Sequence, residues 1–333
     1  MGGGASRRDP TSPGRPADHP AGRCPDDRRL PRDRPRDHRR PSTRRPAPPR
    51  HADPLAAGVD RRGPRGAPGT GAEPAWRRPM NERRTAIDLN CDVGEGAEHD
   101  AALIPLVSSA NIAAGAHAGG GETLAATVRL ALDHGVAIGA HPGHADRGTF
   151  GRRELPITPA AAATLVETQI AAVARCAGTA LHHVKLHGGL YHQVGRDPAL
   201  ADAVAAMLAA RWPHLVVYAA AGSTLVAAAR AAGLAVAEEA FADRRYAPDG
   251  SLVPRAQPGG VIVDPATAAA QGVRLATSGR VETSDTSEIS VAADTLCIHG
   301  DTPAAVAIAA ALRAALGAAG VAIRAATGPA RRG

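Results

Sequence analysis

Short apolar runs alternate with longer alanine-rich stretches along the chain from about residue 86 to residue 323. Alanine leads the helix propensity scale and is depleted in strands, so the alanine-rich stretches predict helices and the β-branched runs predict strands. Strands that alternate with helices of this length are typical of a parallel sheet, hence of a barrel or a doubly wound fold. One segment, residues 281–293, breaks the alternation and predicts a turn with an edge strand. The predicted strands cover residues 86–90, 109–113, 136–140, 181–186, 215–219, 234–238, 261–263 and 295–299.

The helices predicted between these strands have recognisable ends. Thr158 followed by Pro159 predicts an N-cap with proline at the first helical position. Gly178 stands where a C-terminal glycine cap belongs. Pro303 is expected to open the last long helix, which should end near Gly317.

The first 80 residues differ in composition from the rest of the chain. They hold 19 of the 39 basic residues, 9 of the 32 acidic residues and 16 of the 28 prolines, so they carry a net charge of +10 and the remainder carries −3. Almost no apolar run occurs there, and such a segment cannot bury enough surface to offset the entropy lost on ordering. We therefore expect residues 1–79 to be a disordered extension or a gene-model artefact, with Met80 as the true start.

An arginine-rich tail can bind nucleic acid through phosphate contacts or resemble a transit peptide. This tail is dotted with aspartates and is nearly free of the aromatic residues that stack on bases, which argues against both. The body, residues 80–333, has 254 residues, close to the roughly 250 of an α/β barrel, and is expected to be one domain. It has no membrane-spanning run and no signal pattern, which predicts a cytoplasmic protein without membrane or nucleic-acid partners. Cys24, Cys91, Cys176 and Cys297 are too widely spaced to indicate a disulfide framework or a zinc ribbon.

Titratable and amide side chains stand at or just after nearly every predicted strand. In parallel α/β folds the chemistry lies at the carboxyl ends of strands, because the loops there vary without disturbing the core. A single buried histidine or aspartate is usually structural, but six such strand ends together predict an active site. These residues are Asp88, Asn90, Asp92, Asn111, His117, His141, Lys185, His187, Glu238, Glu239, His299 and Asp301.

Lys185 is the only lysine in a chain with 38 arginines. An ammonium is a compact charge whose pKa changes on burial, so it can neutralise a phosphate or an oxyanion, or transfer a proton, where a planar guanidinium cannot. The alternative explanation is an accident of a GC-rich coding sequence.

The sequence lacks the motifs of several other chemistries. The sequence contains no G-x-x-x-x-G-K-[ST] loop and no G-x-S-x-G elbow, and Cys91 lacks an activating neighbour. The glycines at 119–121 precede a predicted helix whose N-terminus could bind an anion. Imidazole and carboxylate suit zinc or manganese, so a metal site stays open, with His117, His141 and Asp88 as its candidate ligands.

Taken in order, the motifs DLNCDVGEG, VSSANIAAGAHAGG, GVAIGAHPGH, FGRR, HVKLHGGLYH, EAFADRRYAPDGSLVPR and ADTLCIHGDTP resemble the LamB/YcsF family. The resemblance extends from about Ile87 to Ile323. This sequence departs from the family pattern where Ala114 and Ala116 replace cysteine and phenylalanine. Gly120 and Gly121 replace an Asp-Pro pair, and Leu186 replaces proline.

The resemblance implies a seven- or eight-stranded TIM-like (β/α) barrel of the glycoside hydrolase/deacetylase type. It also implies the A subunit of an ATP-dependent 5-oxoprolinase, which opens the lactam of 5-oxo-L-proline to L-glutamate together with B and C subunits. ATP would be a co-substrate, with Mg²⁺. Two alternatives stay open: a metal-dependent amidohydrolase or deacetylase on the same barrel, and a non-catalytic subunit that binds the substrate.

We assign candidate roles on this basis. Lys185, together with Arg244 or a histidine, is expected to stabilise the phosphorylated or tetrahedral oxyanion, and His117 or His141, oriented by Asp88 or Asp92, is expected to activate water. The catalytic candidates are Lys185, His117, His141, His187, Asp88 and Asp92. The substrate-binding candidates are Asn90, Asn111, Glu238, Asp243, Arg244, His299 and Asp301.

Overall fold

Seven parallel strands close into a barrel in a computed structural model that describes residue 1, residues 85–302 and residues 304–327. The strand order is β1-β2-β3-β4-β5-β6-β9, and β9 pairs again with β1. A short strand, β10 (Ala322–Ile323), extends the sheet beside the first two residues of β1. The predicted α/β barrel is confirmed, whereas the expectations for residues 1–79 and for Pro303 lie outside the described residues. The barrel strands are β1 (Ala86–Val93), β2 (Ser109–Ala113), β3 (Ala137–His141), β4 (Leu181–Lys185), β5 (Val216–Ala220), β6 (Ala235–Phe241) and β9 (Thr295–His299).

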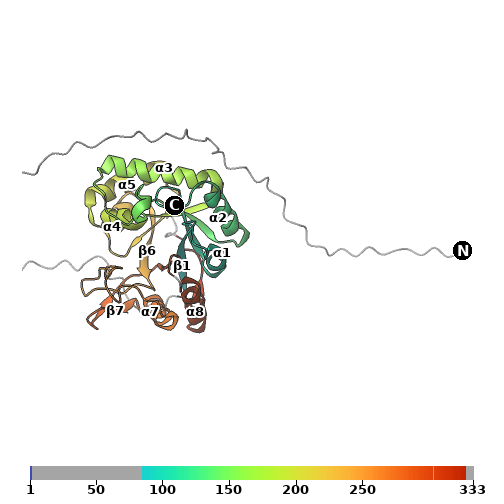
Figure 1. The fold of residues 1–333 in the computed structure, drawn as a ribbon, viewed down its shortest axis with the longest axis vertical. Helices are drawn as coiled ribbons and strands as arrows, with labels where there is room; N and C mark the ends of the chain where they lie inside the picture. The colour runs from blue at the N-terminus through green and yellow to red at the C-terminus, as the bar shows by residue number, and fades with distance from the viewer. Residues whose placement is uncertain (2–84, 303, 328–333) are drawn as a thin grey trace, which may run out of the picture. The chain divides into compact units, whose positions relative to one another are not determined.

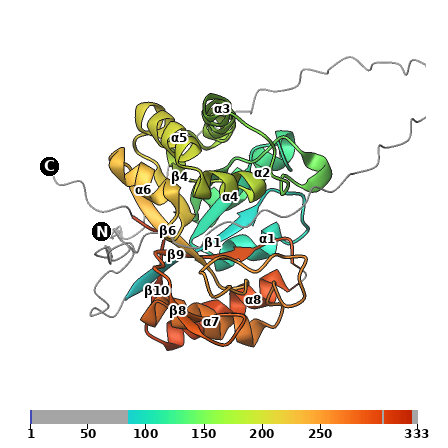
Figure 2. The same ribbon diagram turned by 90° about the vertical axis from the view of Figure 1, so that its left-hand side faces the viewer.

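Helices surround the strands, with α3 and α5 on one side and α7 and α8 on the opposite side (Figures 1 and 2). The predicted ends of α3 are confirmed: the Thr158 hydroxyl accepts a hydrogen bond from the backbone N–H of Ala161, and Gly178 ends the helix with a φ of 57°. No helix among the described residues is long and apolar enough to cross a membrane. The helices are α1 (Asp100–Leu103), α2 (Gly121–Asp133), α3 (Pro159–Ala177), α4 (Gly188–Arg196), α5 (Pro198–Arg211), α6 (Thr224–Ala231), α7 (Pro265–Ser278) and α8 (Ala305–Ala318), with 3₁₀ turns η1 (Ile104–Leu106), η2 (Arg147–Thr149) and η3 (Gly178–Ala180).

Two predictions for the segment between β6 and β9 had different outcomes. The predicted strand at 261–263 is wrong, because Val261 forms only an isolated antiparallel bridge with Arg244, and β6 pairs directly with β9. The segment instead folds back on the loop that follows β6, where the N–H of Ile262 donates to the carbonyl of Asp243. The insertion at 281–293 does contain a turn and strands, as the antiparallel pair β7 (Arg280–Glu282) and β8 (Glu288–Ser290).

Alternation along the strands separates an apolar outer layer from a polar lumen. On β1, the buried residues Leu89, Cys91 and Val93 belong to the hydrophobic core. Asp88 and Asn90, which alternate with them, face the lumen and hydrogen-bond to the hydroxyl of Thr295 on the neighbouring strand β9. Successive side chains of a strand point to opposite faces, so a strand of this kind places every second residue inside the barrel. The polar lumen opens at the carboxyl ends of the strands, where the site lies.

Candidate active site

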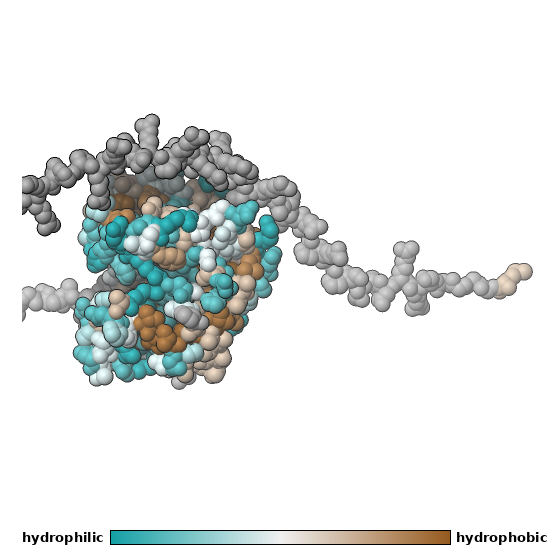
Figure 3. Space-filling view, viewed as in Figure 1, coloured by the Kyte–Doolittle hydropathy of each residue, from teal (hydrophilic) through white to brown (hydrophobic). Residues whose placement is uncertain are grey.

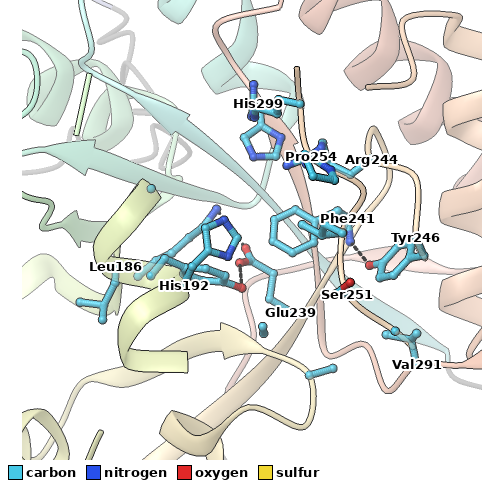
Figure 4. Close-up of a pocket in the computed structure, with 18 of the residues that line it drawn as sticks. Leu186, His192, Glu239, Phe241, Arg244, Tyr246, Ser251, Pro254, Val291 and His299 are labelled. Atoms are coloured by element: carbon cyan, nitrogen blue, oxygen red, sulfur yellow. Dashed lines mark hydrogen bonds and ion pairs between the residues drawn. The ribbon is translucent and has the colours of Figure 1, made fainter. Parts of the chain in front are cut away.

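A pocket of about 890 Å³ opens at the carboxyl ends of the barrel strands. Its walls come from the ends of β1, β3, β4, β6 and β9, from α4, and from the loops after β6 and β8. Figure 3 shows a mainly hydrophilic face that is hollowed between the part carrying α4 and the part carrying β7 and α7. In the close-up, Glu239 and Phe241 of β6 lie beside His192 of α4 (Figure 4). Because this is the edge where α/β barrels carry their chemistry, the pocket is the candidate active site.

The floor of the pocket holds the ammonium of Lys185, which is 3% exposed. Its Nζ lies 2.9 Å from Oδ1 of Asp92 and 3.0 Å from Oε1 of Glu239. It also donates to Sγ of Cys297 at 3.0 Å and to Oδ1 of Asn90 at 3.2 Å. An ammonium has three hydrogens, so four protein acceptors already compete for them.

The charges on the floor stabilise one another. Burial alone would lower the pKa of Lys185, but the charges of Asp92 and Glu239 and the hydrogen bond to Cys297 outweigh it, and the pKa lies well above its ordinary value. Burial would raise the pKa of Asp92, but His141 and Lys185 hold it well below its usual range. Lys185 and Asp92 are therefore an ion pair. Burial raises the pKa of the Cys297 thiol, so this group stays neutral.

Three histidines and one glutamate, Glu95, meet at one wall of the pocket. Oε1 of Glu95 lies 3.2 Å from Nε2 of His117, 3.4 Å from Nδ1 of His187 and 3.8 Å from Nε2 of His141. Nδ1 of His187 and Nε2 of His141 are 2.9 Å apart. The ring of His117 stacks on that of His187 with 3.9 Å between centroids. One ligand atom from each of the four residues lies within 4.8 Å of the others, so the cluster could hold a metal ion.

Burial controls protonation in this histidine–glutamate cluster. It lowers the pKa of His117 to about 3 and, with a smaller effect of His141, also lowers that of His187. Both imidazoles are therefore neutral near pH 7. Burial, followed by the charge of Asp92, raises the pKa of Glu95 well above its ordinary value. A carboxyl group shifted in this direction is suited to accept and release a proton near neutral pH.

Arginines and a histidine border the mouth of the pocket. The Asp243 carboxylate accepts hydrogen bonds at 2.9 Å from both the backbone N–H and Nδ1 of His299, which orients that ring. The Arg244 guanidinium donates to two backbone carbonyls, and burial, followed by repulsion from Arg255, lowers its pKa to about 10. Asp301 pairs with Arg152 and, at 3.5 Å, with Arg255. This border presents positive groups to a substrate that carries a carboxylate or a phosphate.

Three predicted residues lie in the lumen below the floor. Asn111 donates to Oδ1 of Asn90 at 2.7 Å and to Oδ1 of Asp92 at 2.9 Å, so these amides support the carboxylate beneath Lys185. Asp88 stands four residues before Asp92 on β1, about 13 Å away at the rise of a parallel strand. Its carboxylate accepts hydrogen bonds from Ser108 and Ser109. Within the described residues Asp88 is thus not part of the histidine–glutamate cluster, and Asp92, with Oδ2 at 3.4 Å from Nε2 of His141, is the aspartate placed to orient a histidine.

Glu238 lies outside the pocket, while its neighbour Glu239 lies inside it. The Glu238 carboxylate pairs with Arg230 at 2.6 Å and accepts from the backbone N–H of Gly222 at 3.0 Å. Glu239 contacts Lys185 and accepts from the Tyr191 hydroxyl at 2.8 Å. Glu239 was noted at this strand end but was not among the residues given a role.

Glu95, Arg152 and Arg255 are further pocket residues to which the sequence reasoning gave no role. Glu95 stands two residues beyond the end of β1, inside the quoted motif DLNCDVGEG, where an acidic residue between two glycines was the available signal. Arg152 falls in the motif FGRR, on a loop without strand periodicity. The remaining predicted residues His117, His141, Lys185, His187, Arg244, His299 and Asp301 lie in the pocket or in the histidine–glutamate cluster at its wall.

Comparison with known proteins gives consistent matches. The sequence profile of the LamB/YcsF family matches residues 87–331. The A subunit of the 5-oxoprolinase of Heliobacterium modesticaldum is 49% identical over 247 residues, which cover 72% of this chain and 97% of that protein. The corresponding protein of Methylococcus capsulatus is 48% identical over 247 residues, covering 72% and 95%. The crystal structure of a lactam utilization protein from Thermus thermophilus is 44% identical, with a TM-score of 0.68, and the match covers 72% of this chain and 99% of that one.

Proposed function

The chain belongs to the LamB/YcsF family, and we propose that it is the component of a 5-oxoprolinase complex that opens the lactam ring of 5-oxo-L-proline to L-glutamate. The resemblance drawn from the motifs is thereby confirmed. The proposal is supported by the relatives named as A subunits of 5-oxoprolinase and by the related lactam utilization protein. We further propose that the reaction is coupled to ATP hydrolysis, with ATP and Mg²⁺ as co-substrates of a complex with B and C subunits.

The observation that carries this proposal is the pocket that joins a histidine–glutamate cluster, a buried ion pair and an arginine-lined mouth. Opening a lactam requires water to add to the carbonyl carbon, the C–N bond to break and the ring nitrogen to take a proton. An unstrained amide resists this, whereas transfer of the γ-phosphoryl group of ATP to its oxygen, with release of ADP, produces a better electrophile, and a second water then releases the phosphate. The site therefore has to supply a base, an acid and positive groups for a carboxylate and a phosphate.

Each requirement corresponds to residues of the pocket. Glu95, with its raised pKa, is proposed to take the proton of the attacking water on Oε2 and to return it to the ring nitrogen, because its contacts with the three histidines all involve Oε1. Arg152, Arg244 and Arg255 border the pocket and are proposed to bind the carboxylate and the phosphate. His299, held by Asp243, is proposed to hydrogen-bond the substrate.

The four acceptors around the Lys185 ammonium limit how it can contact a substrate. Its hydrogens already point at four protein acceptors, so a substrate oxygen has to replace one of them. A thiol is a weak acceptor, and Cys297 is therefore the contact that is most readily given up. We propose that Lys185 holds Asp92 and Glu239 in place and donates to the developing oxyanion once Cys297 is displaced.

The test is an assay of 5-oxoproline-dependent and ATP-dependent glutamate formation by the chain with and without B and C subunits. Glutamate should form only with all subunits present, and Lys185→Met should abolish it while the circular dichroism spectrum of the chain stays unchanged. Full activity of Lys185→Met would refute the role of the lysine, and full activity of the chain alone would refute the multi-subunit proposal.

A second candidate is a metal-dependent amidohydrolase or deacetylase that works without ATP. The observation in its favour is the histidine–glutamate cluster, whose donor atoms suit a transition metal. Hydrolysis of lactams or acetylated amides by the isolated chain without ATP would support it. Strict dependence on ATP and on partner subunits would exclude it.

A further inference from the structure

The geometry points to a binding site for one divalent transition-metal ion of the zinc class, formed by Glu95, His117, His141 and His187. Three of these residues, Glu95, His141 and His187, line the pocket, so an ion held there is in reach of a substrate. The binding of the ion stands on the geometry alone, whereas any part it plays in ring opening rests on the proposed function.

The directions of the histidine hydrogens support a cation between them. Nδ1 of His141 lies 2.8 Å from the carbonyl oxygen of Lys185, and Nε2 of His187 lies 2.8 Å from that of Phe150. A carbonyl oxygen only accepts, so each of these ring nitrogens must carry the hydrogen. Unless an additional proton lies between the rings, the opposite nitrogens, Nε2 of His141 and Nδ1 of His187, then hold lone pairs. These two nitrogens are 2.9 Å apart.

Two lone pairs at this separation repel each other unless a positive charge lies close to both. A metal ion meets this requirement, and so does a proton shared between the rings. Oε1 of Glu95 adds a third negative or lone-pair-bearing atom, at 3.4 Å from His187 and 3.8 Å from His141. Nε2 of His117 adds a fourth, at 3.2 Å from the same oxygen. Zinc sites usually have four ligands in a tetrahedral arrangement, and this cluster supplies four donor atoms from four residues. A proton shared between two rings would need only two of them.

The hydrogen bonds of the proposed ligands to their neighbours resemble those found in metal sites. Histidines that bind metals usually donate their other ring N–H to a backbone carbonyl or a carboxylate, which fixes the tautomer and the ring orientation. His141 and His187 both have such a carbonyl. The stacking of His117 on His187, with the edge of Phe150 against both rings, fixes the third ligand by packing.

The donor set selects the class of ion. Three imidazoles and one carboxylate suit Zn²⁺ and its neighbours Co²⁺ and Ni²⁺, whereas Mg²⁺ and Ca²⁺ prefer oxygen ligands. The Asp92 carboxylate, with Oδ2 at 3.4 Å from Nε2 of His141, adds negative charge next to the cluster. We therefore expect an ion that survives dialysis and is removed by a strong chelator.

The experiment uses the full chain without an affinity tag. After removal of metal with a chelator, Zn²⁺ or Co²⁺ is titrated back, and the bound metal is measured by elemental analysis, by calorimetry and by the visible spectrum of Co²⁺. We expect one ion per chain and a visible spectrum typical of Co²⁺ with few ligands. The melting temperature should rise, because a ligand that binds only the folded state stabilises it. Glu95→Gln, which keeps the shape of the side chain, and His141→Ala should each weaken binding by about tenfold or more.

His192→Asn is the matched control, because His192 is exposed, lines the same pocket and lies outside the cluster. It should bind the ion as the unchanged chain does. The proposal is overturned if the chelated chain takes up no Zn²⁺ or Co²⁺ and its melting temperature does not respond, or if Glu95→Gln and His141→Ala bind as tightly as the control. These readouts do not involve glutamate formation, so a failed metal site and a failed enzymatic function are distinguished.

Discussion

At the scale of single residues, Glu238 and Glu239 are adjacent in the sequence, yet they lie on opposite faces of β6. Glu238 pairs with Arg230 outside the pocket, and Glu239 pairs with Lys185 on the pocket floor. Successive side chains of a strand point to opposite faces, so only one of two neighbouring glutamates can reach the lumen. The chemistry of this strand end therefore belongs to Glu239.

A pair of matched substitutions tests this assignment. Glu239→Gln keeps the size of the side chain but removes the charge that faces Lys185, and it should lower the kcat/KM of the complex for 5-oxoproline by about 100-fold or more, the range of losses when one electrostatic contact of an active site is removed. Glu238→Gln should leave kcat/KM close to that of the unchanged chain. Equal losses in both variants, measured with the same partner subunits, would contradict the assignment.

The sequence predicted the strand ends but not which of their residues face inward. The strand AVAEEAF carries alanine on both faces, so its hydrophobic pattern does not reveal the register, which follows only from pairing with β5 and β9. Glu95 could not be assigned for another reason. It stands beyond the last residue of β1, where strand alternation no longer applies and the path of the loop decides its position.

At the scale of elements, the predicted strands agree with β1 to β6 and β9, and the failure at 261–263 has a physical explanation. A three-residue apolar run is too short to distinguish a strand from a loop segment that packs against the core. The end of β6 pairs with β9, with Phe241 opposite Cys297, so the barrel closes there and no edge is left for an additional strand. Closure is a property of the whole sheet, which no single segment encodes.

The contact between β3 and β4 depends on a residue without a side chain. A Cβ added to Gly139 would lie 2.1 Å from Nε2 of His183, whose ring also stacks on Tyr218 with 4.2 Å between centroids. Gly139→Ala should therefore lower the free energy of unfolding by about 1–3 kcal/mol, the usual cost of overpacking. Urea denaturation followed by circular dichroism measures this change.

Gly317→Ala is the control for this prediction. Gly317 is exposed in α8, and an added Cβ meets no atom within 4 Å. Alanine has the higher helix propensity, so this variant should gain about 0.5–1 kcal/mol. A Gly139→Ala variant that is as stable as the unchanged chain, or more stable, would show that His183 is not packed against β3 as described.

At the scale of the whole molecule, the described residues close the barrel by themselves. β1 begins at Ala86, the N–H of Ala322 donates to the carbonyl of Thr85, and the N–H of Arg324 donates to that of Ile87. The family profile likewise begins at residue 87. Among the residues that the structure describes, all those that line the pocket or form the histidine–glutamate cluster lie between Asp92 and Asp301. The barrel and the site that the described residues form are thus built from residues 85–327.

The net positive charge of the protein lies in a different part of the chain from the barrel. The first 80 residues carry +10 and the remainder carries −3, so the basic character of the chain does not belong to the barrel. Affinity for polyanions comes mainly from such sequence-independent charge and falls with salt. Shortening the chain from its N-terminus should therefore weaken polyanion binding and leave the stability of the barrel unchanged.

A chain that begins at Met80 should keep the melting temperature, the metal stoichiometry and the complex-dependent glutamate formation of the full chain, and it should lose retention on heparin at low salt. The reason is that the deletion removes 19 arginines and leaves in place the hydrogen bonds of the described residues that close the barrel. Differential scanning calorimetry and a salt gradient on heparin measure the two halves of this prediction. A fall in melting temperature of more than about 3 °C, which corresponds to about 1 kcal/mol in a domain of this size, would show that the upstream residues contribute to the fold. Unchanged retention on heparin would place the polyanion affinity on the barrel, where the arginines that border the pocket are the positive groups to replace next.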